Sequence, residues 1–361
     1  MLPLVKVGLP PSEQLMPSLE RVLYSGQIAE GEQVYEFEER FSKHFGLSHV
    51  LAMSSGTAAL HAALTLSGVS PGDEVISTPM TAEPTNTSIL YCGAKVVWAD
   101  VDPVSGNIDP NSILEKITSK TKAIIVVHYA GYPVRLAEIR EIADRHGISL
   151  IEDCAHALGA KYDGNSVGLI GDFSIFSFQA IKHMPMVDGG VLICKEERHM
   201  RPAKKFRWFG MLKGVPRTEV DITSIGYKYN MNNVVATIGL SQLQVIDARI
   251  NAFKENGKYF DHELAKIPGL DFAKCDEKGE SSYWLYTMLS DTSDEIEKSL
   301  AGAGIHASKL HRPNNFHSIF SQSETSLPGL EKFYQRLLHI PCGWWVSAED
   351  RNHIVNALRK G

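Results

Sequence analysis

The feature that most limits what this chain can fold into is a repeated alternation of short strand patterns and longer helical patterns. It runs through the first two thirds of the 361 residues, where β-branched runs are each followed by an amphipathic stretch. Such alternation is typical of βα units, whose helices cover both faces of a mostly parallel sheet. We therefore expect an α/β fold with a seven-stranded, mostly parallel sheet. The predicted strands are His49–Met53, Glu74–Thr78, Lys95–Asp100, Ala123–His128, Ser149–Glu152, Phe173–Phe176 and Gly190–Cys194.

The stretches between these strands have the apolar spacing of helices. Gly147 follows one of them directly, as is common at a helix C-terminus. The strands that begin at Ala123 and Ser149 are almost continuously apolar, which is expected when helices cover both faces of a sheet. The predicted helices are Thr57–Leu66, Thr85–Tyr91 and Leu136–His146.

The alternation stops after about Met231, which indicates a second domain. A chain of this length is too long for one ordinary core, since domains usually contain about 100–200 residues. We predict a large domain at residues 1–248 and a smaller C-terminal α+β domain at 249–361. The elements predicted after Met231 are helices at Asn232–Asp247, Ile250–Ile267, Ser293–Ala303 and Ala348–Arg359, a strand at Tyr283–Ser290, and a polar loop at Asn314–Ser326 on the surface or over a site.

Charge, cysteine content and hydropathy exclude several kinds of partner. The net charge is −6 and no basic block is present, so a nucleic-acid partner is not expected. The five cysteines are never spaced as a CxxC pair, which suits a reducing compartment and argues against structural zinc. The longest apolar runs, such as Ala123–Val127, fall far below the roughly 18 residues of a membrane span, and residues 1–11 lack a signal-peptide pattern. We expect a cytoplasmic protein with no membrane or metal partner.

Three motifs lie where predicted strands end, which is where ligand sites gather in parallel sheets. Ser54–Leu60 opens a helix, and the free N–H groups of a helix N-terminus can bind phosphate. Asp153 ends one buried strand, and Lys182 follows another. Each also has an ordinary structural explanation, as a helix cap, an ion pair or a solvated lysine. Neither GxGxxG nor GxxxxGK[ST] occurs, which weakens NAD-type and nucleoside-triphosphatase functions.

Together the three motifs indicate a site for pyridoxal phosphate. A lysine can form a Schiff base with the cofactor's aldehyde, and a carboxylate can pair with its pyridine nitrogen. A helix N-terminus can hold its phosphate.

Many ordered motifs make the chain similar to the nucleotide-sugar aminotransferases of the DegT/StrS family, which have the PLP-dependent fold type I of aspartate aminotransferase. The resemblance extends from about Leu4 to Leu358. Chance can supply one such motif but hardly eight in order. The motifs are Ser25-Gly26 with Gly31 and Phe37-Glu38, Ser55 to His61, Pro71 to Ile76, Asp100 to Asp102 with Asn107 to Asp109, Thr121 to Ile125, Ile151 to Asp153, Ser177-Phe178 with Lys182, and Gly226-Tyr227.

The resemblance implies roles for individual residues. Lys182 corresponds to the Schiff-base lysine, Asp153 to the partner of the pyridine nitrogen, and His156 to a residue beside the cofactor ring. These three are therefore the expected catalytic residues, and they also contact the cofactor. The expected phosphate contacts are Gly56, Thr57 and Ser177, and Ser55 is a further expected cofactor contact.

Three positions depart from the family pattern. Ala82 stands where an aromatic residue often stacks on the cofactor ring, so stacking must come from elsewhere, for example from His156. Lys228 aligns with an Asn that often reaches the phosphate across a dimer interface, and a lysine could do so as a point charge. The Gly-Glu-Gly-Gly pattern after the lysine is replaced by Val187 to Gly190, a milder change.

Candidate substrate contacts are Arg207, His311 and Arg312. Arg207 lies where the resemblance implies a nucleotide pyrophosphate, although basic helical runs more often face solvent. His311 and Arg312 lie where the family has a His-Tyr-x-Pro-like stretch. No acidic residue completes a metal-ligand pattern around the histidines, so we expect no metal there. Trp344-Trp345 could shape the pocket or belong to the core.

The resemblance implies an aminotransferase that moves an amino group from L-glutamate to a nucleotide-linked keto sugar, a 4-keto-6-deoxy or 3-keto hexose. Such a reaction belongs to the biosynthesis of deoxyamino sugars, O-antigen, lipopolysaccharide or related polysaccharides. The resemblance also implies a homodimer with shared active sites.

Two alternatives to this function stay open. One is a sugar-nucleotide dehydratase of the same family, in which His replaces the lysine, and His183 directly follows Lys182. The other is a non-catalytic regulatory or sensing protein that retains the fold.

Overall fold

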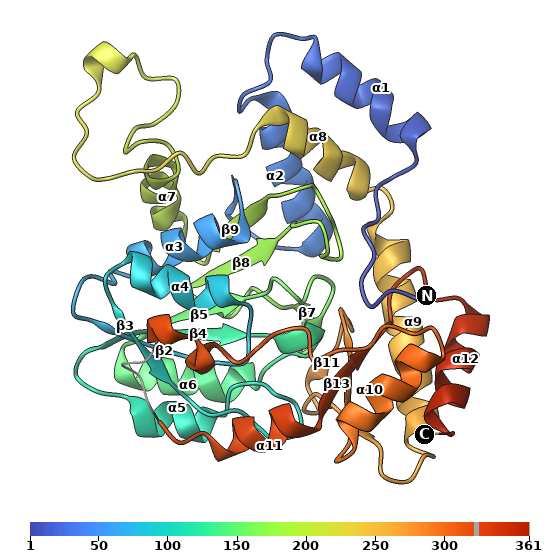
Figure 1. Cartoon of the computed structure of the whole chain (residues 1–361). Helices are drawn as coiled ribbons and strands as arrows, with labels where there is room; N and C mark the ends of the chain where they lie inside the picture. Colours follow the sequence, from blue (N-terminus) through green and yellow to red (C-terminus); the bar gives the residue numbers. More distant parts are fainter. Residues whose placement is uncertain (321–324, 361) are drawn as a thin grey trace.

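The computed structural model describes residues 1–320 and 325–360, and a seven-stranded sheet forms its centre (Figure 1). Five neighbouring strands are parallel, whereas β9 is antiparallel to both of its neighbours. The predicted sheet is confirmed, and each strand begins and ends within two residues of its expected bounds. In order across the sheet, the strands are β1 (Val50–Met53), β9 (Gly190–Cys194), β8 (Phe173–Ser177), β5 (Ser149–Asp153), β4 (Thr121–Val127), β2 (Glu74–Ser77) and β3 (Lys95–Trp98).

Successive residues of the central strands pack into two separate apolar layers. Ile125 and Ile151 lie in one layer, and Ile124 and Leu150 lie in the other. Because side chains alternate along a strand, a sheet with helices on both faces needs apolar residues at every central position. The first layer is covered by α3 (Gly56–Leu66), α7 (Met200–Phe206) and the C-terminal part, and the second by α2 (Glu32–Phe45) and α6 (Leu136–His146).

The predicted helices of this part are present as α3, α4 and α6, and Gly147 ends α6 in the left-handed conformation that suits glycine (φ 64°). The helices α1 and α2, which precede the first strand, were not predicted. The elements of this part not yet named are α1 (Ser12–Leu23), α4 (Glu83–Tyr91), α5 (Pro110–Lys116), the 3-10 helices η1 (Tyr129–Gly131), η2 (Glu197–His199) and η3 (Arg217–Glu219), and the short strands β6 (Lys161–Tyr162) and β7 (Asn165–Ser166).

The C-terminal part contains a three-stranded antiparallel sheet with helices around it. The expected strand at Tyr283–Ser290 begins only at Tyr286, because Tyr283 has a positive φ of 49° that interrupts an extended chain. The predicted boundary after residue 248 falls in the first turn of α9 and stays a prediction. The elements are α8 (Asn233–Gln242), α9 (Ile246–Leu264), β10 (Asp271–Phe272), β11 (Gly279–Glu280), β12 (Tyr286–Leu289), α10 (Ser293–Gly302), η4 (Asn314–Phe316), η5 (Ser318–Phe320), α11 (Pro328–Arg336), β13 (Leu337–Ile340) and α12 (Ala348–Leu358).

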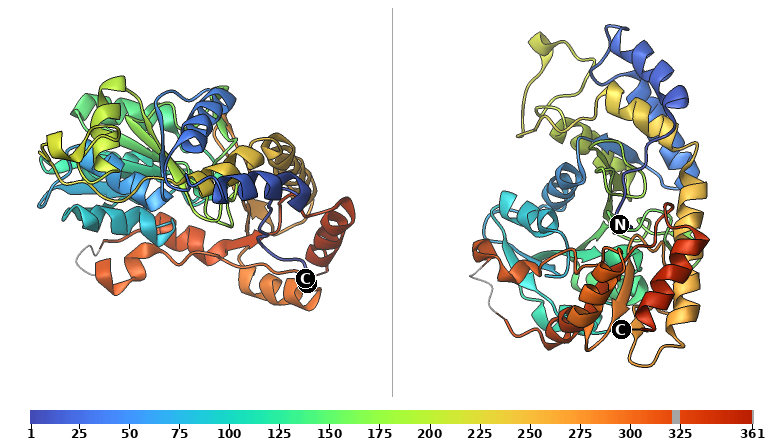
Figure 2. Two further views of the ribbon diagram at one scale, coloured as in Figure 1. Left: turned by 90° about the horizontal axis from the view of Figure 1, so that it is seen from above. Right: turned by 45° about the vertical axis from the view of Figure 1, so that its right-hand side comes forward.

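Both ends of the chain lie beside the C-terminal part, although not next to each other (Figure 1). Leu2 forms a bridge to Ile305, and the indole N–H of Trp345 donates to the carbonyl of Pro3 at 2.9 Å. Helix α1 packs along α8 (Figure 2). Within the described part of the chain, none of the helices combines the length and apolar character that crossing a membrane requires.

The predicted polar loop at Asn314–Ser326 includes residues 321–324, which lie outside the described residues. Its first residue, Asn314, is completely buried against the segment before α4. The Asn314 amide N–H₂ donates to the carbonyl of Thr81 at 2.9 Å, its side-chain oxygen accepts from Asn86 at 2.8 Å, and its backbone N–H donates to Pro79. Asn314 therefore links the C-terminal part to the residues before and within α4.

Candidate active site

The ends of β5 and β8 and the beginning of α3 border a cavity of about 350 Å³. The carboxyl ends of parallel strands and the N-terminus of the helix after β1 meet at this edge, as in other open α/β sheets. Nine of the twelve residues predicted for the site line this cavity: Ser55, Gly56, Thr57, Ala82, Asp153, His156, Ser177, Lys182 and His311. Arg207, Lys228 and Arg312 lie outside it.

Lys182 lies in the turn after β8 and its side chain enters the cavity. Its Nζ atom is 4.1 Å from the centre of the Trp284 ring. Enclosure by the surrounding protein lowers the pKa of the Lys182 amine to about 7, although the nearby Asp153 carboxylate favours the charged form. A substantial fraction of the amine is therefore neutral near pH 7, and neutral amine is the form that attacks a carbonyl or accepts a proton.

Asp153 is the last residue of β5 and faces the cavity with a buried side chain. One carboxylate oxygen accepts the hydroxyl of Thr85 at 2.8 Å, and the other accepts the backbone N–H of Ala155 at 3.0 Å. Burial raises the pKa of Asp153, and these two hydrogen bonds together with Lys182 act in the opposite direction. A buried carboxylate at a cavity wall is stabilised by a cationic N–H group, so Asp153 fits the protonated pyridine nitrogen of pyridoxal phosphate.

The turn from β1 into α3 forms the opposite end of the cavity. Ser55 is the N-cap of α3, and its hydroxyl accepts the backbone N–H of Ala58 at 3.0 Å. A Cβ atom at Gly56 would lie 3.0 Å from Cβ of Ser177, and one at Gly190 would lie 2.6 Å from the backbone nitrogen of Gly56. These glycines allow the backbone of the turn to approach its neighbours closely. The first N–H groups of α3 and the Ser177 hydroxyl suit a phosphate.

His156 belongs to a stack of aromatic rings on one wall. Its ring stacks on Trp284 with centres 4.0 Å apart, and it is nearly parallel to the ring of His311 at 5.6 Å. Burial, followed by the charge of Lys182, lowers the pKa of His156 well below its ordinary value of 6.5, so the imidazole is neutral. Ala82, the N-cap of α4, lines the cavity but adds no ring. Aromatic contact with a bound ring is thus available from the His156 side, as the sequence suggested.

The three predicted residues outside the cavity have other contacts. Arg207 is buried, and its terminal nitrogens donate to Glu38 at 2.7 Å and to Glu30 at 2.9 Å, so its guanidinium serves an internal ion-pair network in place of the expected phosphate contact. Lys228 Nζ donates to Asn230 at 2.7 Å and lies over the Trp208 ring. Arg312 is exposed and donates to the carbonyl of Phe316.

His183, the residue that a dehydratase assignment would use, does not line the cavity. It is buried, and its Nε2 lies 3.2 Å from the carbonyl oxygen of Ser282. Burial lowers the pKa of His183 to about 3. The alternating directions of neighbouring side chains therefore place Lys182 in the cavity and His183 in the core.

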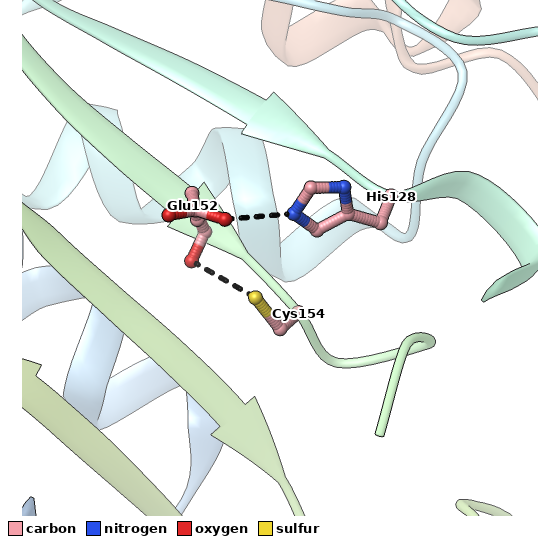
Figure 3. A group of neighbouring side chains, drawn as sticks. All are labelled: His128, Glu152 and Cys154. Atoms are coloured by element: carbon pink, nitrogen blue, oxygen red, sulfur yellow. Dashed lines mark hydrogen bonds and ion pairs between the residues drawn. The ribbon is translucent and has the colours of Figure 1, made fainter. Parts of the chain in front are cut away.

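His128, Glu152 and Cys154 are the one group of potential metal ligands found within the described residues (Figure 3). Glu152 already accepts N–H groups from Gly168, Ile170 and Gly171, and its Oε2 is 3.1 Å from Nε2 of His128. Nδ1 of His128 accepts the backbone N–H of Val134, so Nε2 carries the proton that Glu152 accepts. These hydrogen bonds occupy the atoms that would bind a metal ion, and the group anchors the chain after β5.

Two residues of the site carried no clear signal in the sequence. Thr85 contacts Asp153, and its hydroxyl is 2.9 Å from that of Thr81, one helical turn earlier. The four-residue spacing of Thr81 and Thr85 is visible in the sequence. Nothing local, however, links Thr85 to Asp153, which is 68 residues further along the chain. Trp284 comes from the C-terminal part, and no local pattern links it to Lys182.

The fold and this site define a PLP-type aminotransferase, and comparisons with known proteins agree. Residues 11–359 match the model of the DegT/DnrJ/EryC1/StrS aminotransferase family. GDP-perosamine synthase of Caulobacter vibrioides is 34% identical over 335 residues, covering 91% of this chain and 90% of that protein. The crystal structure of the sugar aminotransferase CalS13 from Micromonospora echinospora superposes with a TM-score of 0.96 at 34% identity over 100% of both chains. Spr1654 from Streptococcus pneumoniae, in its PMP-form, has a TM-score of 0.91 at 26% identity and covers 98% of this chain and 96% of that one.

The chain therefore belongs to the DegT/DnrJ/EryC1/StrS aminotransferase family. It is an aminotransferase of the kind used in sugar biosynthesis, and the resemblance inferred from its motifs is confirmed. The non-catalytic alternative has no support among these relatives.

Proposed function

We propose that this aminotransferase uses pyridoxal phosphate to move an amino group from L-glutamate to a nucleotide-linked keto sugar. The observation that supports this most strongly is the meeting of Lys182, Asp153 and the N-terminus of α3 at one cavity. These groups match the aldehyde, the pyridine nitrogen and the phosphate of the cofactor in chemical character.

When bound, the cofactor supplies an electron-withdrawing ring that stabilises the negative charge left on a carbon that loses its proton. Asp153 holds the ring nitrogen in its protonated form, and the Thr85 hydroxyl keeps the carboxylate oriented. Lys182 would hold the cofactor through its amine, and as a free amine its Nζ atom would accept the proton from the carbon of the amino donor and return it. Its pKa of about 7 allows Nζ both to accept and to return that proton.

The acceptor that we propose is a 4-keto-6-deoxy or 3-keto hexose joined to a nucleoside diphosphate. The name of the relative GDP-perosamine synthase supports a nucleotide-linked sugar. A panel of keto sugars carried on UDP, dTDP, GDP and CDP, scored for glutamate-dependent amination, identifies the carrier and the sugar. No amination with any member would contradict the proposed substrate class.

We further propose a cytoplasmic homodimer in which Lys228 of one chain reaches the phosphate site of the other. Lys228 lies outside the cavity of its own chain, which suits a residue that acts across an interface. A fully active monomer, observed by light scattering, would contradict this role of Lys228.

The role of Lys182 is tested with the variant Lys182→Ala. Wild-type protein mixed with pyridoxal phosphate should gain the absorption band of cofactor joined to a lysine, and Lys182→Ala should lack it, because no other lysine lines the cavity. Lys195→Ala, at an exposed lysine just after β9, is the matched control and should keep the band. An unchanged band in Lys182→Ala would refute the assignment of Lys182 as the residue that holds the cofactor.

The dehydratase alternative has its own test. Glutamate-independent deoxygenation of the sugar by the wild type would support it.

A further inference from the structure

Trp284 is a buried residue of the C-terminal part (2% exposed) that packs behind two residues of the cavity wall, Lys182 and His156. It follows Tyr283, whose positive φ of 49° turns the chain just before β12. The backbone N–H groups of Ser282 and Leu285 donate to the carbonyls of Gly131 and Ala130 in η1, which follows β4. A side chain at Gly131 would lie 2.9 Å from the backbone nitrogen of Trp284. The segment is thus held tightly against the large sheet in a conformation that costs energy for a residue other than glycine.

The indole ring of Trp284 makes three contacts around the site. Its N–H donates to the carbonyl of Ile181 at 2.9 Å, which ties it to the peptide group just before Lys182. The centre of its ring is 4.1 Å from Nζ of Lys182. The ring also stacks on His156 at 4.0 Å with an angle of 19° between the planes. A single side chain therefore touches the backbone and the amine of the lysine as well as the imidazole beside the cavity.

We propose that Trp284 is a positioning residue that holds the Lys182 amine and the His156 ring in the arrangement that amino transfer requires. The inference deepens the proposed function and rests on it for the role of Lys182. An aromatic face within about 6 Å attracts an ammonium group and limits where the amine can move. A stacked ring likewise restricts His156, whose Nδ1 has no hydrogen-bond partner among the described residues to orient it.

Trp345 offers a matched control for a purely structural tryptophan. It also lies in the C-terminal part, and its indole N–H also donates to a backbone carbonyl at 2.9 Å. Its ring packs on Phe253. Neither tryptophan lines the cavity itself, but Trp284 contacts Lys182 and His156, which do. Replacing Trp345 removes a similar volume and the same kind of hydrogen bond without touching Lys182.

The experiment measures the pKa of the Lys182 amine in the full-length chain freed of cofactor. Trace acetylation at a series of pH values, followed by peptide mass spectrometry, gives the fraction of neutral amine. Trp284→Leu should lower this pKa by about half a unit to one unit, because the charged form loses its aromatic partner. Trp284→Phe, which keeps a ring, should give an intermediate pKa, and Trp345→Leu should leave it unchanged. A pKa that stays the same or rises in Trp284→Leu, or that falls equally in Trp345→Leu, would overturn the proposal.

A second readout uses the protein loaded with pyridoxal phosphate. In the half-reaction with L-glutamate, Trp284→Leu should reduce kcat at least tenfold with less than a threefold change in KM, and Trp284→Phe should recover most of the loss. Equal changes in kcat and KM, or no recovery with Phe, would contradict positioning. Since acetylation needs no transaminase activity, failure of the proposed function alone would leave the shifted Lys182 pKa intact.

Discussion

At the scale of single residues, two pairs of neighbours at the active site have one member in the cavity and the other buried elsewhere. Lys182 enters the cavity while His183 is buried against Ser282, and Asp153 faces the cavity while Glu152 faces the opposite side of the sheet. In β5 this follows from the alternation of side chains along a strand. A shift of one residue in aligning the chain with its relatives would therefore exchange a reactive group for a structural one.

The lowered pKa of Lys182 predicts how the stability of the cofactor-free protein depends on pH. The folded protein has a Lys182 pKa of about 7 and the unfolded chain about 10.5, so between these values the unfolded state binds more protons and stability rises with pH. Lys182→Met removes this dependence. At pH 7 the variant should be more stable than the wild type, because it has no amine to bury. This difference in free energy of unfolding should shrink by roughly 2 kcal/mol between pH 7 and pH 10, allowing for partial solvent access.

Urea unfolding at several pH values measures this difference. Lys195→Met, at an exposed lysine, is the control and should differ from the wild type by the same amount at every pH. If the difference between Lys182→Met and wild type is also constant, the amine is not shifted by burial.

At the scale of elements, Asn314 lies in the loop that follows α10, and its hydrogen bonds tie this loop to the segment before α4 and to α4 itself. Its three hydrogen bonds hold this loop, which also carries His311, over the cavity. Asn314→Ala should raise KM for the keto sugar severalfold and destabilise the fold by about 2 kcal/mol, because two side-chain hydrogen bonds are lost and buried partners are left unpaired. Steady-state kinetics and urea unfolding test both effects. Asn315→Ala, at the neighbouring half-buried residue, should change neither.

Glu152 is the anchor of the connection between β5 and β8. Burial alone would raise the pKa of Glu152, but hydrogen bonds from His128 and from backbone N–H groups outweigh it, and the net pKa is lowered. Glu152→Ala should destabilise the protein by about 3 kcal/mol, since several buried N–H groups lose their acceptor, and Glu152→Gln should cost less. Thermal unfolding measures both. Addition of a chelator should leave the wild-type melting temperature unchanged, whereas a large drop would indicate a metal at His128, Glu152 and Cys154.

At the scale of the whole molecule, two segments project from one end. Helix α1 and the segment 210–226 project there (Figures 1 and 2), and Ile225 and Tyr24 are 78% and 86% exposed. Large apolar residues that are this exposed on projecting segments are typical of a surface that another chain covers. In the proposed homodimer, Ile225→Lys should therefore shift the mass in light scattering toward the monomer and reduce amination at least tenfold. Leu114→Lys, on α5, is the control and should keep both dimer and activity. A dimeric, active Ile225→Lys variant would exclude this surface.

The sequence by itself determined the sheet, the three motifs at its edge and the family. These depend on local properties. Apolar runs specify strands that are buried on both faces, and Ser55, Asp153 and Lys182 lie at or within a few residues after the ends of strands that must meet.

Only the tertiary structure decided which distant groups complete the site. Arg207 was a candidate phosphate contact until folding paired it with Glu30 and Glu38, and Trp284 had no local pattern that linked it to Lys182, 102 residues earlier. Ion pairs and ring contacts between residues far apart in the chain leave no spacing to recognise. They depend on how the C-terminal part packs on the sheet, and that packing follows from the sum of many contacts across the molecule.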